Sequence, residues 1–347
     1  MRKIVERLFQ NPAVEAIIHN QTGVGSLGLQ EEALILSAAF LRSKHSMFVV
    51  KNNLYEAQNL YQRLVTLCED DVYLYCVEES LQVEAIASSP ELYAQKIETL
   101  TKLLESDKPV ICVTHIAAVL RYLPTVERFK ESILNLSLGY RISMDSLKTL
   151  LVQAGYKHVA RVDQPLCFSF RGGVVDIFSV QNEHPVRIEF FDDEIDSIRM
   201  FDVASQRTIA TMKSIEIVPA TDFIYTDDEF AYMQEKILAK LAKDMKKADN
   251  ALELEERIQL DLEYLQMHVQ ERYLYRYMNF LPQTNCLLDY MPNAQIILSN
   301  VEEIKAHVQF VMDETISYIQ QLYQEHRQIV QITDSKLISF QKQPIQR

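Results

Sequence analysis

The sequence predicts an α/β fold: a parallel sheet covered by helices, a small antiparallel α+β domain inserted into that part of the chain, and a helical segment that returns to the sheet. Three observations support this prediction. Continuous apolar runs alternate with helical patterns as far as residue 140, short strands with alternating polar and apolar residues follow over 141–222, and residues 223–325 are mainly helical in pattern.

Residues 1–140 have the pattern of the first part of an α/β domain. Apolar stretches of five or six residues predict buried strands, and the segments between them repeat apolar residues at helical spacing. Strands without polar alternation are buried on both faces, which is typical of a parallel sheet. The predicted strands are 47–51, 72–76 and 109–114, and the predicted helices are 33–41, 54–67 and 91–104.

Residues 141–222 have a different character. A predicted helix is followed by short alternating strands, and residues typical of turns lie between the strands, as at 181–185 and 192–193. This pattern predicts a small antiparallel α+β domain. The predicted helix is 143–154, and the predicted strands are 173–178, 185–191, 195–201 and 213–218.

Residues 223–325 predict helices and one strand that completes the first domain. The charged stretch 227–280 carries no strand signal, and a predicted strand at 295–299 precedes a predicted helix at 301–325. The helix over 234–258 has one apolar face, which favours packing on the first domain over a free coiled coil. Residues 326–347 carry weak signals and are interpreted as a linker or a truncated end. The apolar face consists of Ile237, Leu238, Leu241 and Met245.

The composition argues against several classes of protein. The 347 residues contain 35 Lys and Arg against 48 Asp and Glu, a net charge of −13, which argues against a general nucleic-acid-binding surface but leaves room for a local basic patch. No apolar run reaches the roughly 20 residues of a membrane span. Residues 1–9 form an amphipathic helical pattern without a signal-peptide core, so we expect a cytoplasmic protein. The five cysteines and eight histidines lack metal-ligand spacing, which predicts buried reduced thiols and no metal site.

Three of the chain's seven glycines, Gly23, Gly25 and Gly28, lie in one loop before a predicted helix. Gly23 and Gly28 have the G-x-x-x-x-G spacing of a phosphate-binding loop, in which Lys and then Ser or Thr follow. Here Leu29 and Gln30 take those places, so the charge and the Mg²⁺ ligand are missing. The loop over 23–30 is therefore interpreted as a degenerate phosphate loop, with anion binding by backbone amides as the alternative.

The strand that would complete a nucleotide site has a second defect. Such a strand should end in Asp-Glu to hold Mg²⁺, but residues 295–299 are followed by Asn-Val and only then by Glu302 and Glu303. Acidic residues at the start of a helix usually interact favourably with the helix dipole. Both defects predict the absence of nucleotide hydrolysis.

Strand alternation over 185–191 places Arg187, Glu189 and Phe191 on one face, with Val, Ile and Phe on the other. If the second face is the core, Phe191 is exposed beside an arginine, which is the composition of a protein-binding hot spot. The alternative is that Phe191 closes a small core and Arg187 pairs with Glu189 or Asp193.

The stretch 155–220 is the most specific part of the chain. Its motifs are GY at 155, RGGVVDIF from 171, PVRIEFFDDEIDSIR from 185, and then FD, SQRT and PA. The glycine pair at 172–173 permits positive φ or a close approach of the backbone. The stretch resembles the second domain of the nucleotide-excision-repair helicase UvrB and of the Mfd family of transcription-repair coupling factors, and the resemblance covers roughly residues 10–320.

Two departures choose between these relatives. UvrB-like proteins have an intact phosphate loop and an aromatic-rich hairpin that binds DNA. Here the phosphate loop is degenerate, and the interval 77–92, about 16 residues with the single aromatic Tyr93 just beyond it, is too short for that hairpin. The chain therefore resembles the N-terminal UvrB-like module of the Mfd family, a degenerate helicase-like domain without hydrolysis. The alternatives are a UvrB-type helicase subunit with ATP-dependent DNA binding and an unrelated nucleotide-binding enzyme.

The resemblance implies a non-catalytic adaptor that recruits UvrA to RNA polymerase stalled at DNA damage, through a UvrA-binding domain over 141–222. By motif, Arg171 and Arg187 would bind carboxylates on UvrA and Phe191 would fill an apolar pocket. The resemblance implies no cofactor in this part of the protein. In the family, later domains bind RNA polymerase, double-stranded DNA, ATP and Mg²⁺, and a C-terminal domain masks the UvrA-binding face.

Overall fold

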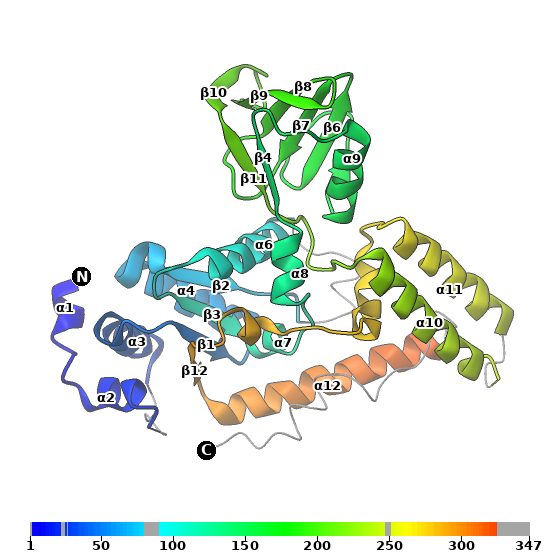
Figure 1. The fold of residues 1–347 in the computed structure, drawn as a ribbon. Helices are drawn as coiled ribbons and strands as arrows, with labels where there is room; N and C mark the ends of the chain where they lie inside the picture. Colours follow the sequence, from blue (N-terminus) through cyan, green and yellow to red (C-terminus); the bar gives the residue numbers. More distant parts are fainter. Residues whose placement is uncertain (1, 22–24, 26, 80–89, 247–250, 325–347) are drawn as a thin grey trace.

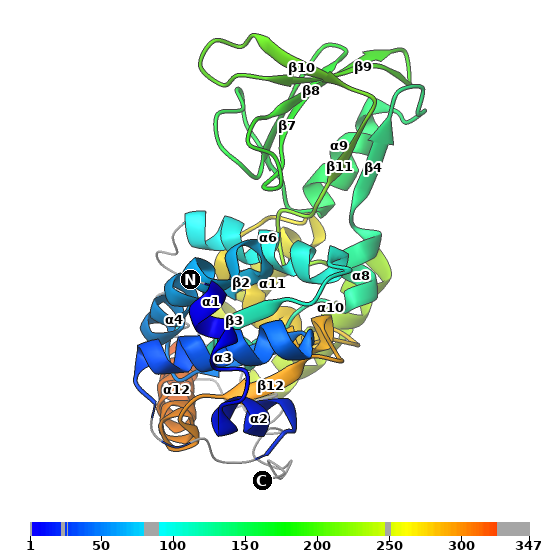
Figure 2. The same ribbon diagram turned by 90° about the vertical axis from the view of Figure 1, so that its left-hand side faces the viewer.

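A computed structural model describes residues 2–21, 25, 27–79, 90–246 and 251–324. It confirms the mixed α/β class with a parallel sheet and an antiparallel domain (Figure 1). The antiparallel domain stands above the parallel sheet, and a helical segment lies beside the sheet. Seen from the side, the antiparallel domain is joined to the rest of the molecule at its lower end (Figure 2).

The parallel sheet has the strand order β12-β1-β3-β2. β12 (Gln295–Leu298) comes from the far end of the described chain and pairs in parallel with β1 (Met47–Lys51). On its other side β1 pairs with β3 (Ile111–His115), and β2 (Val72–Tyr75) forms the edge beyond β3. Because β1 has neighbours on both edges and helices on both faces, all five of its residues are buried.

Alternate residues of the parallel sheet support two separate cores. Met47 and Val49 pack with the apolar faces of α3 and α4, whereas Phe48 and Cys112 pack with α6 and with Phe129 of α8. The helices around the sheet are α1 (Arg2–Glu6), α2 (Pro12–Ile18), α3 (Leu29–Ser43), α4 (Leu54–Cys68), η1 (Glu69–Asp71), α6 (Pro90–Glu105), α7 (Ile116–Val119) and α8 (Val126–Glu131).

The helix predicted over residues 1–9 is wrong in its extent. α1 ends at Glu6, and a second helix, α2, starts at Pro12. The Asn11 side chain accepts a hydrogen bond from the Ala13 amide at 2.9 Å and so caps α2. Proline at the first helical position suits a new start rather than a continuing helix.

The antiparallel domain is built on a six-stranded sheet in the order β10-β9-β8-β7-β6-β5, with β4 and β11 forming a separate pair. The sequence predicted β7, β8, β9 and β11 but missed β4, β5, β6 and β10. The strands are β4 (Leu134–Ser137), β5 (Lys157–His158), β6 (Cys167–Arg171), β7 (Val174–Phe178), β8 (Val186–Phe191), β9 (Glu194–Phe201), β10 (Thr208–Met212) and β11 (Ser214–Ile217).

The pairing of β4 with β11 indicates that the antiparallel domain already includes β4. The four residues of β4 lie opposite the four of β11 in an antiparallel ladder. The boundary predicted between residues 140 and 141 therefore falls after a strand that is hydrogen-bonded to the second domain. Helix α9 (Met144–Gln153) buries Leu147 and Leu151 against one face of the six-stranded sheet. The opposite face, which carries Asp176, Arg187 and Phe191, is called the outer face.

The helical segment forms a core of its own. α10 (Asp227–Asp244) contributes Ile237 and Leu241 to a cluster with α11 (Ala251–Gln266) and η2 (Arg272–Phe280). The prediction that this helix packs on the first domain is therefore wrong, because its apolar face meets the two helical elements that follow it. Leu238, predicted on that face, is exposed.

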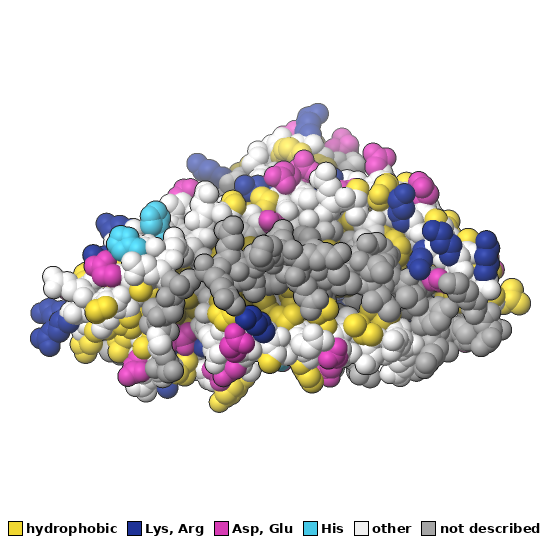
Figure 3. Space-filling model, turned by 90° about the horizontal axis from the view of Figure 1, so that it is seen from below, with side chains coloured by type: hydrophobic (Ala, Val, Ile, Leu, Met, Phe, Trp, Pro, Cys, Tyr) yellow, Lys and Arg dark blue, Asp and Glu magenta, His cyan; other side chains and the backbone are white. Residues whose placement is uncertain are grey.

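The chain after η2 returns to the parallel sheet. η3 (Leu287–Tyr290) precedes β12, and α12 (Val301–Gln324) then runs below the sheet toward α10 (Figure 1). On the face seen from below, acidic, basic and apolar side chains are interspersed (Figure 3). No described helix is long and apolar enough to cross a membrane.

A buried ion pair joins the first domain to the chain leaving the antiparallel domain. Lys96 of α6 lies 2.9 Å from the Asp222 carboxylate, and both side chains are 3% exposed. The Arg121 guanidinium is 3.8 Å from the same carboxylate. Burial raises the pKa of Asp222, but the charges of Lys96 and Arg121 outweigh burial and the pKa is lowered. The ionised carboxylate is thus held at the junction between the two domains.

Four of the five cysteines match the prediction of buried reduced thiols. Cys286 is only half-buried, and the buried ones are Cys68, Cys76, Cys112 and Cys167. Burial raises the pKa of Cys68 and Cys167, so their thiols stay protonated and unreactive. Within the described ranges, no group of three His, Cys, Asp or Glu side chains is placed to hold a metal ion.

Candidate protein-binding face

The glycine loop ends at the N-terminus of α3, where the helix uses its own carboxylate. Gly28 is the N-cap residue, and its amide donates to the Glu31 side chain at 2.9 Å. Leu29 and Gln30 are the first two residues of the helix. Gly25 has open space around it, and Gly23 lies outside the described residues. The Gly28 amide at this helix end is therefore already bonded to the carboxylate of Glu31, so it is not available to a bound anion.

Ligands of open α/β sheets bind at the carboxyl ends of the strands. In this chain, side chains at that edge of the parallel sheet bond to one another. Lys51, the last residue of β1, lies 2.8 Å from the Glu32 carboxylate, and the ammonium group is largely buried. The Ser299 hydroxyl, just after β12, donates to the other oxygen of Glu32. The lysine at this edge is thus neutralised by a carboxylate from α3.

A second carboxylate lies at the same edge. Glu79 accepts a hydrogen bond from the Leu54 amide at 2.5 Å, and it lies 3.7 Å from Nδ1 of His115 and 3.6 Å from Nε2 of His307. Burial is the main cause that lowers the pKa of His115 to about 3, so this histidine is neutral. The interval 77–92, predicted too short for a DNA-binding hairpin, lies largely outside the described residues.

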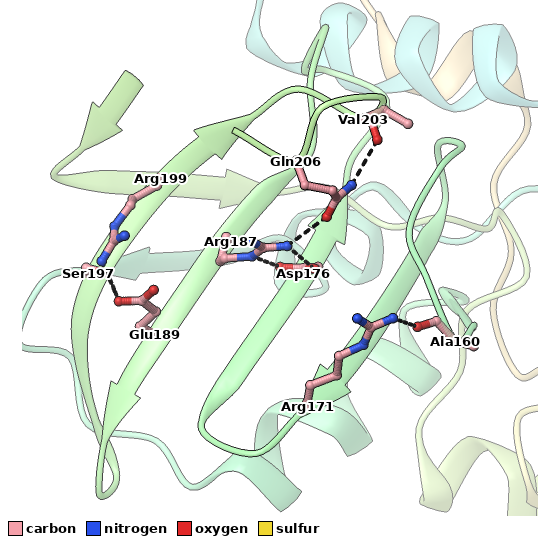
Figure 4. A network of polar contacts seen from close by, with 9 residues as sticks. All are labelled: Ala160, Arg171, Asp176, Arg187, Glu189, Ser197, Arg199, Val203 and Gln206. Carbon is pink, nitrogen blue, oxygen red and sulfur yellow. Dashed lines mark hydrogen bonds and ion pairs between the residues drawn. The ribbon is translucent and has the colours of Figure 1, made fainter. Parts of the chain in front are cut away.

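The outer face of the six-stranded sheet carries a row of polar side chains. The register places Ser169, Asp176, Arg187 and Arg199 directly opposite one another in β6, β7, β8 and β9. Residues in such a row point to the same side of the sheet. Figure 4 shows the side chains of Asp176, Arg187 and Arg199 on this side.

Arg187 is held firmly within this row. Its Nε and Nη2 donate to the two oxygens of Asp176 at 2.7 and 2.9 Å, and Nη2 also donates to Gln206 at 3.0 Å. The guanidinium carbon lies 4.4 Å from the centre of the Phe201 ring. The hydrogen bonds to Asp176 are the main cause that raises the pKa of Arg187.

The pairing of Arg187 corrects one alternative drawn from the sequence. Neither Glu189 nor Asp193 is its partner, because Asp176 stands directly opposite it in β7. Glu189 instead accepts hydrogen bonds from Ser197, at 2.9 Å, and from Arg199 of β9 (Figure 4). Two adjacent ion pairs therefore cross the outer face.

Arg171 lies at the end of β6 and is less constrained. Its Nη2 donates to the backbone carbonyl of Ala160 (Figure 4), and it forms no ion pair with the carboxylates of the described residues. Gly172, the next residue, has a φ of +59° and turns the chain into β7, as the glycine pair predicted. Arg171 is exposed and presents its guanidinium to solvent.

Phe191 ends β8 on the outer side. Its side chain is 79% exposed, whereas Val186 and Ile188 of the same strand are fully buried. The alternation predicted from the sequence is confirmed, and the alternative that Phe191 closes a small core is wrong. The face thus combines Arg171, Arg187 and Phe191, with Phe191 exposed at the end of the strand that carries Arg187.

Two polar partners on this face, Asp176 and Gln206, were not predicted from the sequence. Asp176 could have been found by extending the alternation rule to 173–178, where the neighbouring Val175 and Ile177 form core contacts. Gln206 lies in the loop before β10, with a φ of +59°. No local pattern indicates that its side chain reaches Arg187.

Comparisons with known proteins agree with this description. Residues 134–223 match the model of the UvrB interaction domain. The chain is similar to transcription-repair-coupling factors from Bacillus subtilis (36% identity over 323 residues, 90% of this chain), Staphylococcus epidermidis (30% over 312 residues, 86%) and Staphylococcus haemolyticus (28% over 332 residues, 93%). It spans 27%, 26% and 28% of these relatives, respectively, or about a quarter of their length.

Proposed function

Since this chain is homologous to transcription-repair-coupling factors over most of its own length, we propose that it is the part that recruits UvrA. In this proposal it is a non-catalytic adaptor for nucleotide excision repair, and it brings UvrA to RNA polymerase stalled at DNA damage. The UvrB interaction domain is the region that binds, and its outer sheet face makes the contact.

One observation carries the proposal: the exposed Phe191 lies on the same sheet face as Arg187, within the matched domain. Exposed aromatic side chains beside arginine are typical of binding hot spots. In the proposal Phe191 enters an apolar pocket of UvrA. Arg171 and the free edge of Arg187 bind carboxylates around that pocket.

The proposed role needs no nucleotide chemistry from this part of the protein. Glu32 and Glu79 place two carboxylates at the edge of the parallel sheet where phosphates would bind, and Lys51 is already paired. Like charges at that edge would repel a nucleotide phosphate. These contacts favour an adaptor over a UvrB-type helicase subunit with ATP-dependent DNA binding.

The other proposed partners are RNA polymerase, DNA and ATP, and we assign them to regions that the longer relatives contain beyond the matched part. We propose that later domains bind RNA polymerase and double-stranded DNA and use ATP with Mg²⁺. We also propose that a C-terminal domain covers the outer face in the resting protein. The outer face is then available to UvrA only when that cover is displaced.

Calorimetric titration of UvrA into this chain tests the proposal. Phe191→Ala and Arg187→Ala are each expected to weaken binding by about 2 kcal/mol or more, roughly 30-fold, as truncation of a hot-spot residue does. Tyr55→Ala is the matched control, because Tyr55 is an aromatic residue of α4 with a 69% exposed side chain away from the antiparallel domain. Unchanged affinity in both outer-face variants would refute the assignment.

A further inference from the structure

A third ion pair, between Arg141 and Glu194, lies beside Phe191 and involves none of the three residues predicted from the sequence. Across the β8–β9 hairpin Phe191 is paired with Glu194, and an isolated bridge pairs Glu194 with Arg141 on the far side. Residues paired across neighbouring strands point to the same side of a sheet. Phe191, Glu194 and Arg141 therefore form one row on the outer face.

Backbone hydrogen bonds on either side of Arg141 hold this residue in the row, so its position does not depend on the ion pair of its side chain. The Gly139 amide donates to the Ile195 carbonyl at 2.9 Å, and the Ile142 amide donates to the Asp193 carbonyl at 2.9 Å. Gly139 has a φ of +79°, which turns the chain after β4 toward the hairpin. The segment 139–142 thus extends the sheet at its tip.

The Arg141 side chain retains most of its binding capacity. Its Nε and Nη2 both donate to one oxygen of Glu194, at 3.0 and 2.9 Å. A guanidinium has five N–H donors, so three remain without a partner among the described residues. The side chain is 79% exposed, as is that of Phe191, so these donors face solvent.

Stability alone does not explain the pair. An ion pair as exposed as this one contributes little to the free energy of unfolding, because water screens it and both side chains lose entropy. The backbone hydrogen bonds already fix the segment at the hairpin. Glu194 does hold the Arg141 guanidinium in one orientation, which lowers the entropy lost when a partner binds.

We infer that Arg141 is a further contact residue for UvrA, oriented by Glu194 and adjacent to the Phe191 anchor. This inference rests on the proposed function. It states the chemistry of the partner surface: an apolar pocket that accepts Phe191, with a carboxylate on its rim opposite Arg141. Continuity with Phe191 along one row of the sheet is the observation that carries it.

Titration of UvrA into six versions of the chain tests the inference: the unaltered chain, Phe191→Ala, Arg141→Ala, Glu194→Gln, the Arg141→Ala/Glu194→Gln double variant and Lys305→Ala. Arg141→Ala is expected to weaken binding at least fivefold with an unchanged melting temperature. Arg141→Ala in the Glu194→Gln background is expected to weaken it by a similar factor, because the arginine itself makes the contact. Lys305→Ala is the matched control, because Lys305 forms an exposed ion pair with Glu302 on α12.

The outcomes separate the inference from the proposed function. If the unaltered chain does not bind UvrA, the proposed function fails. If the unaltered chain binds and Phe191→Ala weakens binding, but Arg141→Ala equals the Lys305→Ala control, the inference alone is overturned. It is also overturned if Arg141→Ala has no effect once Glu194 is glutamine, because Arg141 then acts only by holding the hairpin.

Discussion

Arg171 and Arg187 share a sheet face but differ in how many of their hydrogen-bond donors are free. Arg187 uses three of its five N–H groups on Asp176 and Gln206, so only the two on Nη1 remain for a partner. Arg171 uses one, on the Ala160 carbonyl, and four remain without a partner among the described residues. Arg187 is therefore both part of the fold and a contact residue, whereas Arg171 contributes mainly as a contact.

This difference predicts separate effects on stability and affinity. Arg187→Ala is expected to lower the free energy of unfolding by about 1–3 kcal/mol, because it leaves the Asp176 carboxylate, in a residue only 8% exposed, without its partner. Arg171→Ala is expected to change stability by less than about 0.5 kcal/mol. Both variants are expected to weaken UvrA binding.

Urea unfolding followed by circular dichroism, with titration of UvrA on the same samples, measures both quantities. Arg187→Ala combined with Asp176→Ala serves as the control, because it removes both partners of the ion pair. We expect the double variant to be more stable than Arg187→Ala alone. Equal losses of stability for Arg171→Ala and Arg187→Ala would contradict the division of roles.

At the scale of elements, the end of α9 fixes where the antiparallel domain joins the rest of the chain. Gly155 follows α9 with a φ of +88°, and a Cβ there would lie 2.6 Å from the Cβ of Thr221. The Ala220 amide donates to the Ala154 carbonyl at 2.7 Å, and the Tyr156 hydroxyl donates to the Val218 carbonyl at 2.6 Å. The entering and leaving segments of the domain thus pack directly on each other.

Gly155→Ala is expected to destabilise the chain by more than about 2 kcal/mol, because positive φ alone costs alanine about 1–2 kcal/mol and its Cβ would also collide with Thr221. Gly172→Ala is the matched comparison. Gly172 also has positive φ, +59°, but a Cβ there meets nothing within 4 Å, so we expect only the backbone cost of about 1–2 kcal/mol. Chemical denaturation compares the two, and a larger loss at Gly172 would contradict the packing argument.

For the whole molecule, the sequence predicted those features that depend on local pattern. β1 and β3 each begin with an apolar run, at 47–50 and 111–113, so the local pattern was enough to predict their burial in a parallel sheet. β4 and β10 were missed because few of their residues are buried, so no apolar run marks them in the sequence. The packing of α10 was assigned to the wrong partner, because an apolar helix face does not indicate which surface covers it.

The same distinction applies to the candidate site. The exposure of Phe191 followed from alternation along one strand, but the Arg187–Asp176 ion pair depends on the register between two strands. The contacts at the edge of the parallel sheet join residues still further apart in the chain. Glu32 meets Ser299, and Glu79 meets His307, neither of which any local spacing indicates.

These long-range contacts lead to a prediction about nucleotides. We expect Mg-ATP to leave the melting temperature of this chain unchanged and to be hydrolysed no faster than in buffer. Restoring the loop chemistry with Leu29→Lys and Gln30→Thr is expected to be insufficient, because Glu32 and Glu79 still hold negative charge where the phosphates would lie. Adding Glu32→Gln to that double variant frees Lys51, and we expect weak nucleotide binding to appear first in the triple variant. Hydrolysis by the unaltered chain that Gly28→Ala abolishes would show that the glycine loop is a working phosphate loop.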